Sequence, residues 1–263
     1  MSAKKNDLTI PWPFAPTQVR LNTDTSLLKI IAMLTMLCDH MGKMLFPQYR
    51  VMRIIGRIAF PIYAYCIAVG CVYTRNPFGY LKRILLLALI SQPLYAVSMG
   101  HSVSAMYSVS FMENPLKAVW NFYIHSWNKP SILVSLAVGV LLIWALRERQ
   151  LVLGAAMLVL AFLIKGELDY GIKGIALMLL FYVFCSHRWL SLPVMLAFMG
   201  WWGLQGSGYT LFGFDFSIQM FALMALPVIY IHTNSALKLP KWLFYSFYPL
   251  HLILIYVLDH FVM

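Results

Sequence analysis

The sequence is poor in charged residues, and acidic residues are the rarest of them. Asp and Glu together number 9 and Lys and Arg 20 in 263 residues, so charged residues make up 11% and hydrophobic residues 61%. Soluble domains carry about 25% charged residues. This shortage of charge, with a mean hydropathy of +0.75, excludes an ordinary soluble domain and predicts a polytopic membrane protein.

The sequence also lacks a cysteine framework, an internal repeat and a compact basic face. Its four cysteines lie in apolar segments and show neither metal-ligand spacing nor a disulfide pattern, so we expect small buried side chains and no metal. The basic residues are scattered over short loops, which is not typical of nucleic-acid binding. We therefore expect membrane lipids, and no nucleic acid, as partners.

Apolar windows separated by polar or Gly/Pro breaks predict an all-α membrane bundle of about nine transmembrane helices, with a range of eight to ten. These windows lie near residues 27–46, 54–73, 80–98, 130–146, 150–164, 171–186, 190–205, 216–232 and 243–262. We expect residues 1–26 to form a cytoplasmic tail and residues 27–263 one membrane-embedded domain. The only long loop, 99–129, is rich in aromatic residues, which favours a segment at the membrane interface.

The distribution of Lys and Arg predicts the orientation in the membrane. When the loops are assigned to alternating sides, eleven basic residues fall on the side of the N-terminus and six on the other. Since cytoplasmic loops carry the excess of basic residues, we expect a cytoplasmic N-terminus and, with nine helices, a periplasmic C-terminus.

Asp39 and His40 lie together inside the first apolar window. On insertion scales the Asp alone costs about 2.5–3.5 kcal/mol at the centre of a membrane helix, so solubility does not explain the pair. His40 is either a general base, because imidazole titrates near neutral pH, or a hydrogen-bonded structural histidine. Neighbouring side chains point about 100° apart on a helix, so we do not expect Asp39 to orient His40.

Other polar residues are expected to lie at a similar depth. His40 is placed about 20 Å, and His251 about 12 Å, from the cytoplasmic face by the rise of a helix. Arg57 either pairs with Asp39 or Asp169, or holds an anionic group or an oxyanion. Asp169 opens the sixth helix, where a carboxylate also favours the positive end of the helix dipole.

Two further features are open to a functional and a structural interpretation. Arg75, Lys82 and Arg83 surround a Pro/Gly turn on the cytoplasmic side and either grip phosphates or contact anionic lipid. Gln92 precedes Pro93 in the third helix, where it marks a kink with an uncommon polar side chain.

Several blocks in this sequence resemble the TraX family, the F-type pilin acetylases. They are Leu28-Lys29-Ile30-Ile31-Ala32 through Cys38-Asp39-His40-Met41-Gly42, Arg53-Ile54-Ile55-Gly56-Arg57-Ile58-Ala59-Phe60-Pro61, Ser91-Gln92-Pro93, Asp169-Tyr170-Gly171 with Gly174, and Phe244-Tyr245-Ser246-Phe247-Tyr248-Pro249-Leu250-His251. They follow the family order from about Leu27 to the end of the chain. A looser similarity runs to membrane acyltransferases that use coenzyme A, where a basic residue eleven positions before a histidine (Lys29 and His40 here) and a Tyr-x-x-His element (Tyr248 and His251) recur.

The resemblance implies an inner-membrane enzyme of a plasmid or other conjugative element. It would move acetyl from acetyl-CoA to the N-terminal amine of a pilin subunit, which is the expected partner. The site residues implied are His40, Asp39, Arg57 and His251 for catalysis, Lys29, Arg75, Lys82 and Arg83 for the donor, and Asp169, Tyr170, Gln92 and Arg53 for the substrate.

Several alternatives remain open at this point. Transfer is either direct or through a covalent acetyl group on His40 or Cys38. The acceptor could also be a glycan or a small molecule. Outside the enzymes, the same buried polar residues are compatible with a non-catalytic pilin chaperone or a proton-coupled transporter.

Overall fold

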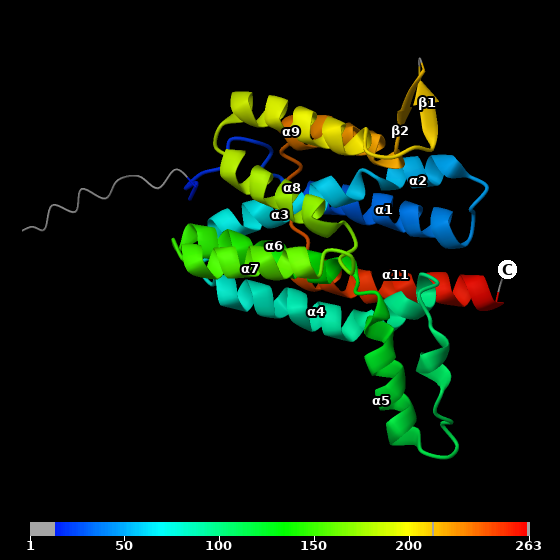
Figure 1. Ribbon diagram of the computed structural model, residues 1–263. Helices are drawn as coiled ribbons and strands as arrows, with labels where there is room; N and C mark the ends of the chain where they lie inside the picture. Colours follow the sequence, from blue (N-terminus) through cyan, green and yellow to red (C-terminus); the bar gives the residue numbers. More distant parts are fainter. Residues whose placement is uncertain (1–13, 212, 262–263) are drawn as a thin grey trace, which may run out of the picture.

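The computed structural model describes residues 14–211 and 213–261, and this part of the chain is almost entirely helical (Figure 1). The elements are α1 (Thr25–Met44), α2 (Arg50–Gly56), α3 (Ala59–Tyr73), α4 (Pro77–Ser98), η1 (Ser104–Tyr107), α5 (Pro115–His125), η2 (Ser126–Asn128), α6 (Ile132–Arg147), α7 (Leu151–Leu163), α8 (Gly171–Phe184), α9 (Arg188–Gly203), β1 (Tyr209–Leu211), β2 (Phe214–Phe216), η3 (Ile218–Met224), α10 (Ala225–Tyr230) and α11 (Lys241–Phe261). The two short strands pair as an antiparallel hairpin. The all-α prediction is confirmed.

Every window expected to be helical contains a helix, but fewer helices have the length and hydropathy of a membrane span. Among the described residues, three qualify: Arg50–Tyr73, Pro77–Ser98 and Trp242–Phe261. A fourth is added if the bent pair Pro115–Asn128 and Ile132–Arg147 is one span. These apolar helices are compatible with a membrane protein, whereas the number of nine spans stays a prediction.

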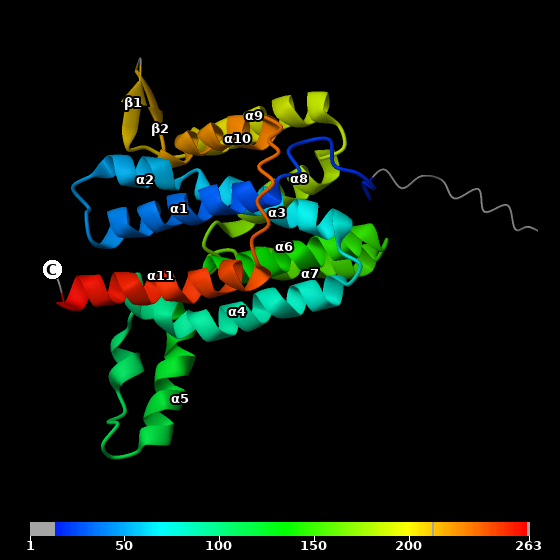
Figure 2. The same ribbon diagram turned by 180° about the vertical axis from the view of Figure 1, so that it is seen from behind.

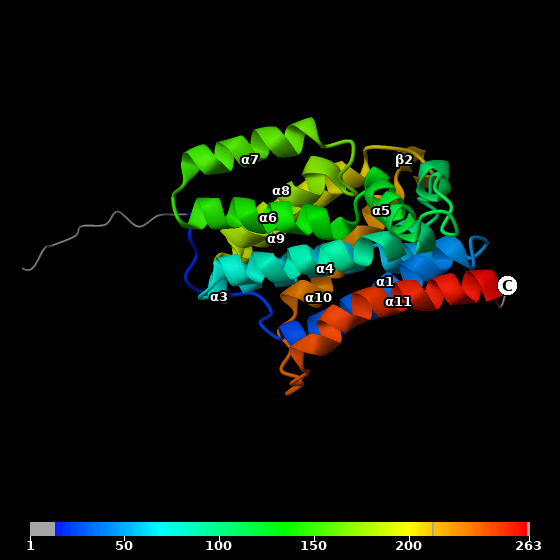
Figure 3. The same cartoon turned by 90° about the horizontal axis from the view of Figure 1, so that it is seen from below.

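Helix α3 lies at the centre of the bundle. Eleven of its 15 residues are buried, and it packs against α1, α6, α8 and α10. A helix that is apolar on all sides is expected in such a position. Helix α7 is equally apolar, but Ala161 is its only buried residue, and Figure 3 shows it on the outside of the bundle beside α6. Its apolar surface is that of a helix facing lipid.

The helix expected over residues 54–73 is divided at Arg57. The amides of Arg57 and Ile58 bond to the carbonyls of Ile54 and Ile55, both at 3.2 Å, which is the spacing of a 3₁₀ turn. Pro61 has no N–H with which to continue an α-helical ladder. This single 3₁₀ turn separates α2 from α3 within the continuous helical stretch Arg50–Tyr73, and Arg57 at the turn bonds Asp39 on α1.

Helices α1 and α2 approach closely because glycines stand at their contact. A Cβ atom at Gly42 would lie 2.6 Å from Cβ of Met52, and one at Gly56 would overlap the side chain of Asp39. Small residues allow helices in membranes to pack with their backbones close together. Gly56 therefore brings the backbone of α2 against the carboxylate of Asp39.

The segment that precedes α1 packs against the rest of the bundle. Leu21 and Asn22, which precede α1, are fully buried, and Tyr65 donates a hydrogen bond of 2.6 Å to the carbonyl of Asn22.

Helix α11 runs beside α4 and α1 (Figure 2). Helix α5, which lies in the loop expected at the membrane interface, projects away from the bundle, at 66° across the break to α6.

Candidate active site

A large cavity of about 1040 Å³ runs along one face of α1. Lys29 and His40 both line it, because eleven residues correspond to three helical turns and return to the same face. The rise of a helix separates the two residues by about 16 Å. Among the described residues, eight of the ten Lys, Arg, Asp and Glu side chains on its wall are basic: Lys29, Lys43, Arg53, Arg57, Arg83, Lys129, Lys165 and Lys173 against Asp39 and Asp169.

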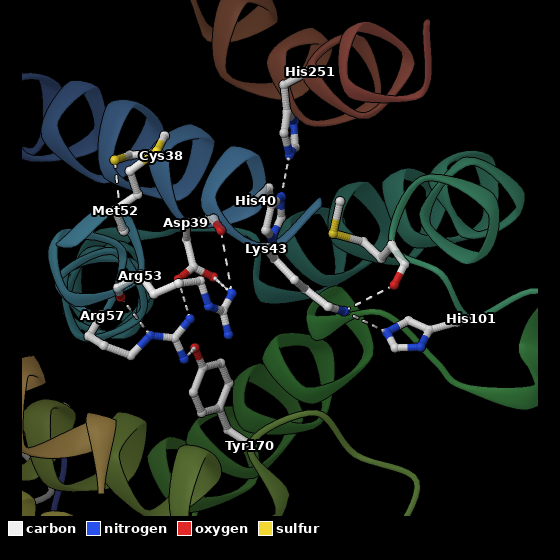
Figure 4. A network of polar contacts seen from close by, with 11 residues as sticks. Cys38, Asp39, His40, Lys43, Met52, Arg53, Arg57, His101, Tyr170 and His251 are labelled. Carbon is white, nitrogen blue, oxygen red and sulfur yellow. Dashed lines mark hydrogen bonds and ion pairs between the residues drawn. The ribbon is translucent and has the colours of Figure 1, made fainter. Parts of the chain in front are cut away.

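Asp39 is the centre of an ion network between α1 and α2. One carboxylate oxygen accepts a hydrogen bond from Arg53 at 2.9 Å, and the other accepts from Arg57. Arg57 also donates to the hydroxyl of Tyr170 at 3.3 Å, as Figure 4 shows. The pairing of Arg57 with Asp39, one of the two ion pairs expected from the sequence, is confirmed.

His40 belongs to a different network, which reaches α11. Its Nδ1 lies 2.9 Å from Nε2 of His251, and Nδ1 of His251 lies 3.0 Å from the carbonyl oxygen of Phe247. A carbonyl only accepts, so His251 donates from Nδ1 and accepts at Nε2. His40 then donates from Nδ1, and its Nε2 carries a free lone pair. Within the described part of the chain Nε2 of His40 makes no hydrogen bond, so it remains available to a ligand in the cavity.

The two imidazoles lie at the same level, which corrects the depths estimated from the sequence. Their separation of 2.9 Å excludes the offset of about 8 Å along the helix axis that the residue counts gave. The reason is that helix starts are not level: His40 is the sixteenth residue of α1 and His251 the eleventh of α11. His251 is 3% exposed, and the rings of Phe247 and Tyr248 cover it.

The position of Lys43 on α1 was not recognised from the sequence as part of the site. Its ammonium group donates 3.0 Å to the carbonyl of Met99 and lies 3.3 Å from Nε2 of His101 (Figure 4). Burial, together with the charges of Lys43 and Lys129, lowers the pKa of His101 to about 4. The signal for Lys43 was its spacing, because a residue three positions after His40 shares its helix face.

The outer end of the cavity, at the C-terminal half of α1, combines charged and aromatic side chains. Asp169 and Tyr170 line it, and Tyr170 stacks on Phe60 with ring centroids 4.0 Å apart, while Trp202 meets both edge-on. Although the Asp169 residue is exposed, the protein packed around its carboxyl group partly desolvates it and raises its pKa above the ordinary value, while nearby cations oppose the shift. Lys129, Lys165 and Lys173 also line this end. From the sequence they were counted only among the basic loop residues that predict the orientation.

The opposite end of the cavity holds two of the four residues implied for donor binding. Lys29 and Arg83 line the wall, and Nζ of Lys29 lies 5.2 Å from the ring centroid of Phe244. Arg75 and Lys82 are exposed and do not belong to the lining. Of the three basic residues around the Pro/Gly turn, Arg83 is therefore the one that lines the cavity.

Gln92 and Cys38 point away from the cavity. The amide of Gln92 is fully buried, donates to the carbonyls of Ser126 at 2.7 Å and Lys129 at 3.0 Å, and accepts from the amide of Ser131 at 2.9 Å. It thereby fixes the break between α5 and α6. The thiol of Cys38 contacts the carbonyl of Met52 on α2 at 3.6 Å (Figure 4). The structure thus brings nine of the twelve site residues to the cavity or to one another. Gln92 lies in a packing position, and Arg75 and Lys82 lie outside the lining.

Comparisons with known proteins identify the family of the chain. The sequence is 24% identical over 250 residues to the probable fimbrial assembly protein FimC, serogroup H1, of Dichelobacter nodosus, which covers 87% of this chain and 92% of that protein. An uncharacterized protein of Rickettsia prowazekii (strain Madrid E) is 39% identical over 66 residues, 25% of each chain. No solved structure matches the chain. The family model described as TraX protein matches residues 24–259, and the chain therefore belongs to the TraX family.

Proposed function

We propose that this protein is a membrane acetyltransferase that moves acetyl from acetyl-CoA to the N-terminal α-amine of a pilin subunit. Membership of the TraX family and the similarity to a protein named for fimbrial assembly support a pilin-related role. The observation that carries the acetyl transfer is the cavity itself. It joins a basic end at Lys29 and Arg83 to an imidazole, His40, that has one unbonded nitrogen.

The chemistry of the basic end fits an anionic donor. Lys29 and Arg83 would hold the phosphates of acetyl-CoA, since cations on a cavity wall form charge-assisted hydrogen bonds with phosphate. Apolar side chains of α1 and α3, Met33, Met36 and Ile67, line the path from Lys29 toward His40. A narrow extended thioester arm suits such a wall. Acetyl-CoA supplies the acetyl group as a thioester, which is reactive toward amines.

His40 is the general base of the proposed reaction. As the amine nitrogen forms its bond to the acetyl carbon and the carbon–sulfur bond breaks, Nε2 of His40 accepts the proton that the amine loses. The hydrogen bond from Nδ1 of His40 to His251 stabilises the imidazolium that forms. His40 then returns the proton to the leaving thiolate, so that the products are an N-acetylated pilin and coenzyme A.

Arg57 is the proposed stabiliser of negative charge on the acetyl oxygen. Its guanidinium group is 9% exposed and is held by Asp39 and Tyr170, so it is fixed before the substrate binds. A preorganised cation of this kind acts on the charge that develops in the transition state. Asp39 therefore contributes by positioning Arg57 and Arg53.

The proposed location is the bacterial inner membrane, with the N-terminus cytoplasmic and the C-terminus periplasmic. Lys29 and Arg83 then face the cytoplasm, where acetyl-CoA is present. Arg57, Asp169 and Tyr170 lie toward the opposite end of the cavity, where a processed pilin N-terminus would enter. Direct transfer is favoured over an acetylated Cys38, because the Cys38 thiol contacts Met52 instead of lining the cavity.

Intact-mass and N-terminal peptide analysis of the mature pilin tests this function. The pilin is co-expressed with the wild-type protein, with His40→Ala, or with neither, at equal membrane levels of both enzyme forms. We expect one acetyl group on the N-terminal amine with the wild type alone. Acetylation that persists with His40→Ala would reject the base and keep the enzyme. An unmodified pilin in all three samples would reject pilin acetylation and favour a glycan acceptor, transport or a chaperone.

Lys29→Gln tests the assignment of the donor end. We expect a rise of about tenfold in the KM for acetyl-CoA, with little change in the KM for the pilin, because one charge-assisted phosphate contact is lost. Lys238→Gln is the matched control, since Lys238 is exposed and lies outside the cavity. An equal effect of both substitutions would contradict the placement of the phosphates at Lys29.

A further inference from the structure

The outer half of the cavity carries far more positive than negative charge. Six basic side chains line it from different parts of the chain: Lys43 on α1, Arg53 on α2, Arg57 at the turn between α2 and α3, Lys129 before α6, Lys165 before α8 and Lys173 on α8. Two acidic side chains, Asp39 and Asp169, stand against them. This excess is unexpected at a place where an amine is to bind, because an amine in water is mostly an ammonium cation near neutral pH.

The neighbouring groups do not cancel this charge. Both oxygens of Asp39 are already paired with Arg53 and Arg57. Asp169 is a single carboxylate near Lys129, Arg57 and Lys43, and it offsets only one of their charges. His40 and His251 bond to each other, and neither brings a negative charge.

Four of the six basic side chains lie outside the Asp39 network: Lys43, which bonds the carbonyl of Met99, and the lysines Lys129, Lys165 and Lys173. Lys173 donates a hydrogen bond to the neutral side chain of Gln205, and Nζ of Lys165 lies 4.1 Å from the ring centroid of Phe162. Neither partner carries a charge. We call these three lysines the cationic wall.

We infer that the cationic wall admits the acceptor amine only in its neutral form, and that it thereby selects an N-terminal α-amine over a lysine side chain. This inference rests on the proposed function and names the form of the substrate. Lys129 and Lys165 are exposed, so the wall lies where the cavity opens to water. Its positive charges repel an ammonium group by an amount that salt reduces, while the neutral amine, which is also the nucleophile, is not repelled. In the transfer step the amine then brings its lone pair to the acetyl carbon and gives its proton to Nε2 of His40 only as the new bond forms.

The ordinary pKa values of the two kinds of amine give the size of this selection. An α-amine titrates near 7.7–8.0 and a lysine amine near 10.4, so that at pH 7 about a tenth of the former and about one part in 2,500 of the latter are neutral. A site that accepts neutral amines alone therefore favours the α-amine over the lysine amine roughly 300-fold, independently of the shape of the substrate. No carboxylate contact with the substrate is needed for this preference.

Two inhibitory peptides that differ in charge but not in shape test the inference. Both carry the first residues of the mature pilin, and the N-terminal amine is replaced by a trimethylammonium group in one and by a tert-butyl group in the other. Their inhibition constants are measured in the acetylation assay with the full-length protein. The variants are Lys129→Gln/Lys165→Gln/Lys173→Gln and the charge-matched control Lys117→Gln/Arg188→Gln/Lys238→Gln, whose side chains are exposed and lie outside the cavity.

Because a tert-butyl group is also the more apolar of the two, the diagnostic quantity is the change in the ratio of the two inhibition constants. We expect the wild type and the control to favour the neutral peptide by about tenfold or more, and the wall variant to lose at least most of that preference. A ratio that is the same in all three proteins would overturn the inference, while acetylation of the pilin in the same assay would leave the proposed function standing. Absence of acetylation by the wild type would overturn both.

Discussion

Asp39 and His40 are neighbours on one helix, yet their environments differ. Both oxygens of Asp39 are occupied by Arg53 and Arg57, so that its network is closed. His40 uses one ring nitrogen to bond His251 and leaves the other at the cavity, so that its network is open. A closed network stabilises the packing of helices, whereas an open one retains the ability to take up a proton. Two polar residues that look alike in the sequence thus have separate tasks.

Asp39→Ala is expected to give the largest effect, on stability. Removal of one partner of a buried ion pair leaves Arg53 and Arg57 uncompensated, which costs about 3–5 kcal/mol. Thermal unfolding of the detergent-purified protein measures the loss. His40→Ala is the comparison, because it removes one hydrogen bond without leaving a buried charge, and its melting temperature should stay near that of the wild type. Equal melting temperatures of the two variants would contradict the distinction between closed and open networks.

His251→Leu is expected to act on catalysis. It removes the acceptor that His40 uses when it becomes an imidazolium, a hydrogen bond worth about 1.5–3 kcal/mol because one partner is charged. The expected result is a fall in kcat of about 10- to 100-fold with both KM values unchanged. His260→Leu is the matched control, since His260 makes the same kind of bond to the carbonyl four residues earlier, at 3.1 Å from Tyr256, and is exposed. A rise in KM without a fall in kcat would assign His251 to binding instead.

Gly56→Ala tests how tightly the closed network is built. The added methyl group would overlap the side chain of Asp39 and push α2 away from α1. Overpacking of this kind costs about 1–3 kcal/mol. Gly200→Ala on α9 is the control, because nothing lies within 4 Å of its Cβ position and alanine favours a helix. Unfolding midpoints that move equally in the two variants would contradict the close approach at Gly56.

Much of the fold could be predicted from the sequence because apolar windows and their breaks are local signals. The helices expected at 130–146, 171–186 and 190–205 agree with α6, α8 and α9 to within two residues at either end. The helix expected at 54–73 lies within the continuous stretch Arg50–Tyr73, but its 3₁₀ turn at Arg57 was not predicted, since the window is apolar on both sides of that turn. Helix α5 was missed as a helix because its exposed apolar side chains were interpreted as a loop at the membrane interface.

The candidate site was predictable where residues share one helix face and not where distant elements meet. The spacing of Lys29 and His40 places both on the cavity side of α1. The contact of His40 with His251 joins residues 211 positions apart, and no periodicity reports it. Gln92 shows the opposite error, because an unusual polar residue in a helix was assigned to substrate binding, whereas its amide holds the backbone around Ser126 and Ser131.

Asp24 lies at the start of α1, the helix that also carries Asp39 and His40. Substitution of this carboxylate is expected to give the smallest effect. Burial opposes its ionisation, but hydrogen bonds from Ser235 at 2.8 Å, Leu27 at 3.2 Å and Thr233 at 3.3 Å outweigh it and hold the pKa below the ordinary 3.8. Because the folded protein then binds this proton less readily than the unfolded chain, the carboxylate stabilises the fold above pH 3.8, and this contribution is lost as the pH falls through the lowered pKa.

Asp24→Asn should remove that part of the pH dependence and shift the melting temperature at pH 6 by only about 2 °C or less, since the group is partly exposed and its bonds are screened by water. Melting curves of the wild type and the variant between pH 6 and pH 3 measure the difference. The gap between the two should close as the pH falls, because protonation of Asp24 in the wild type does what the substitution does permanently. A gap that widens toward acid would mean that the contacts with Ser235 and Thr233 do not favour the charged carboxylate, and Asp24 would then resemble neither of the networks around Asp39 and His40.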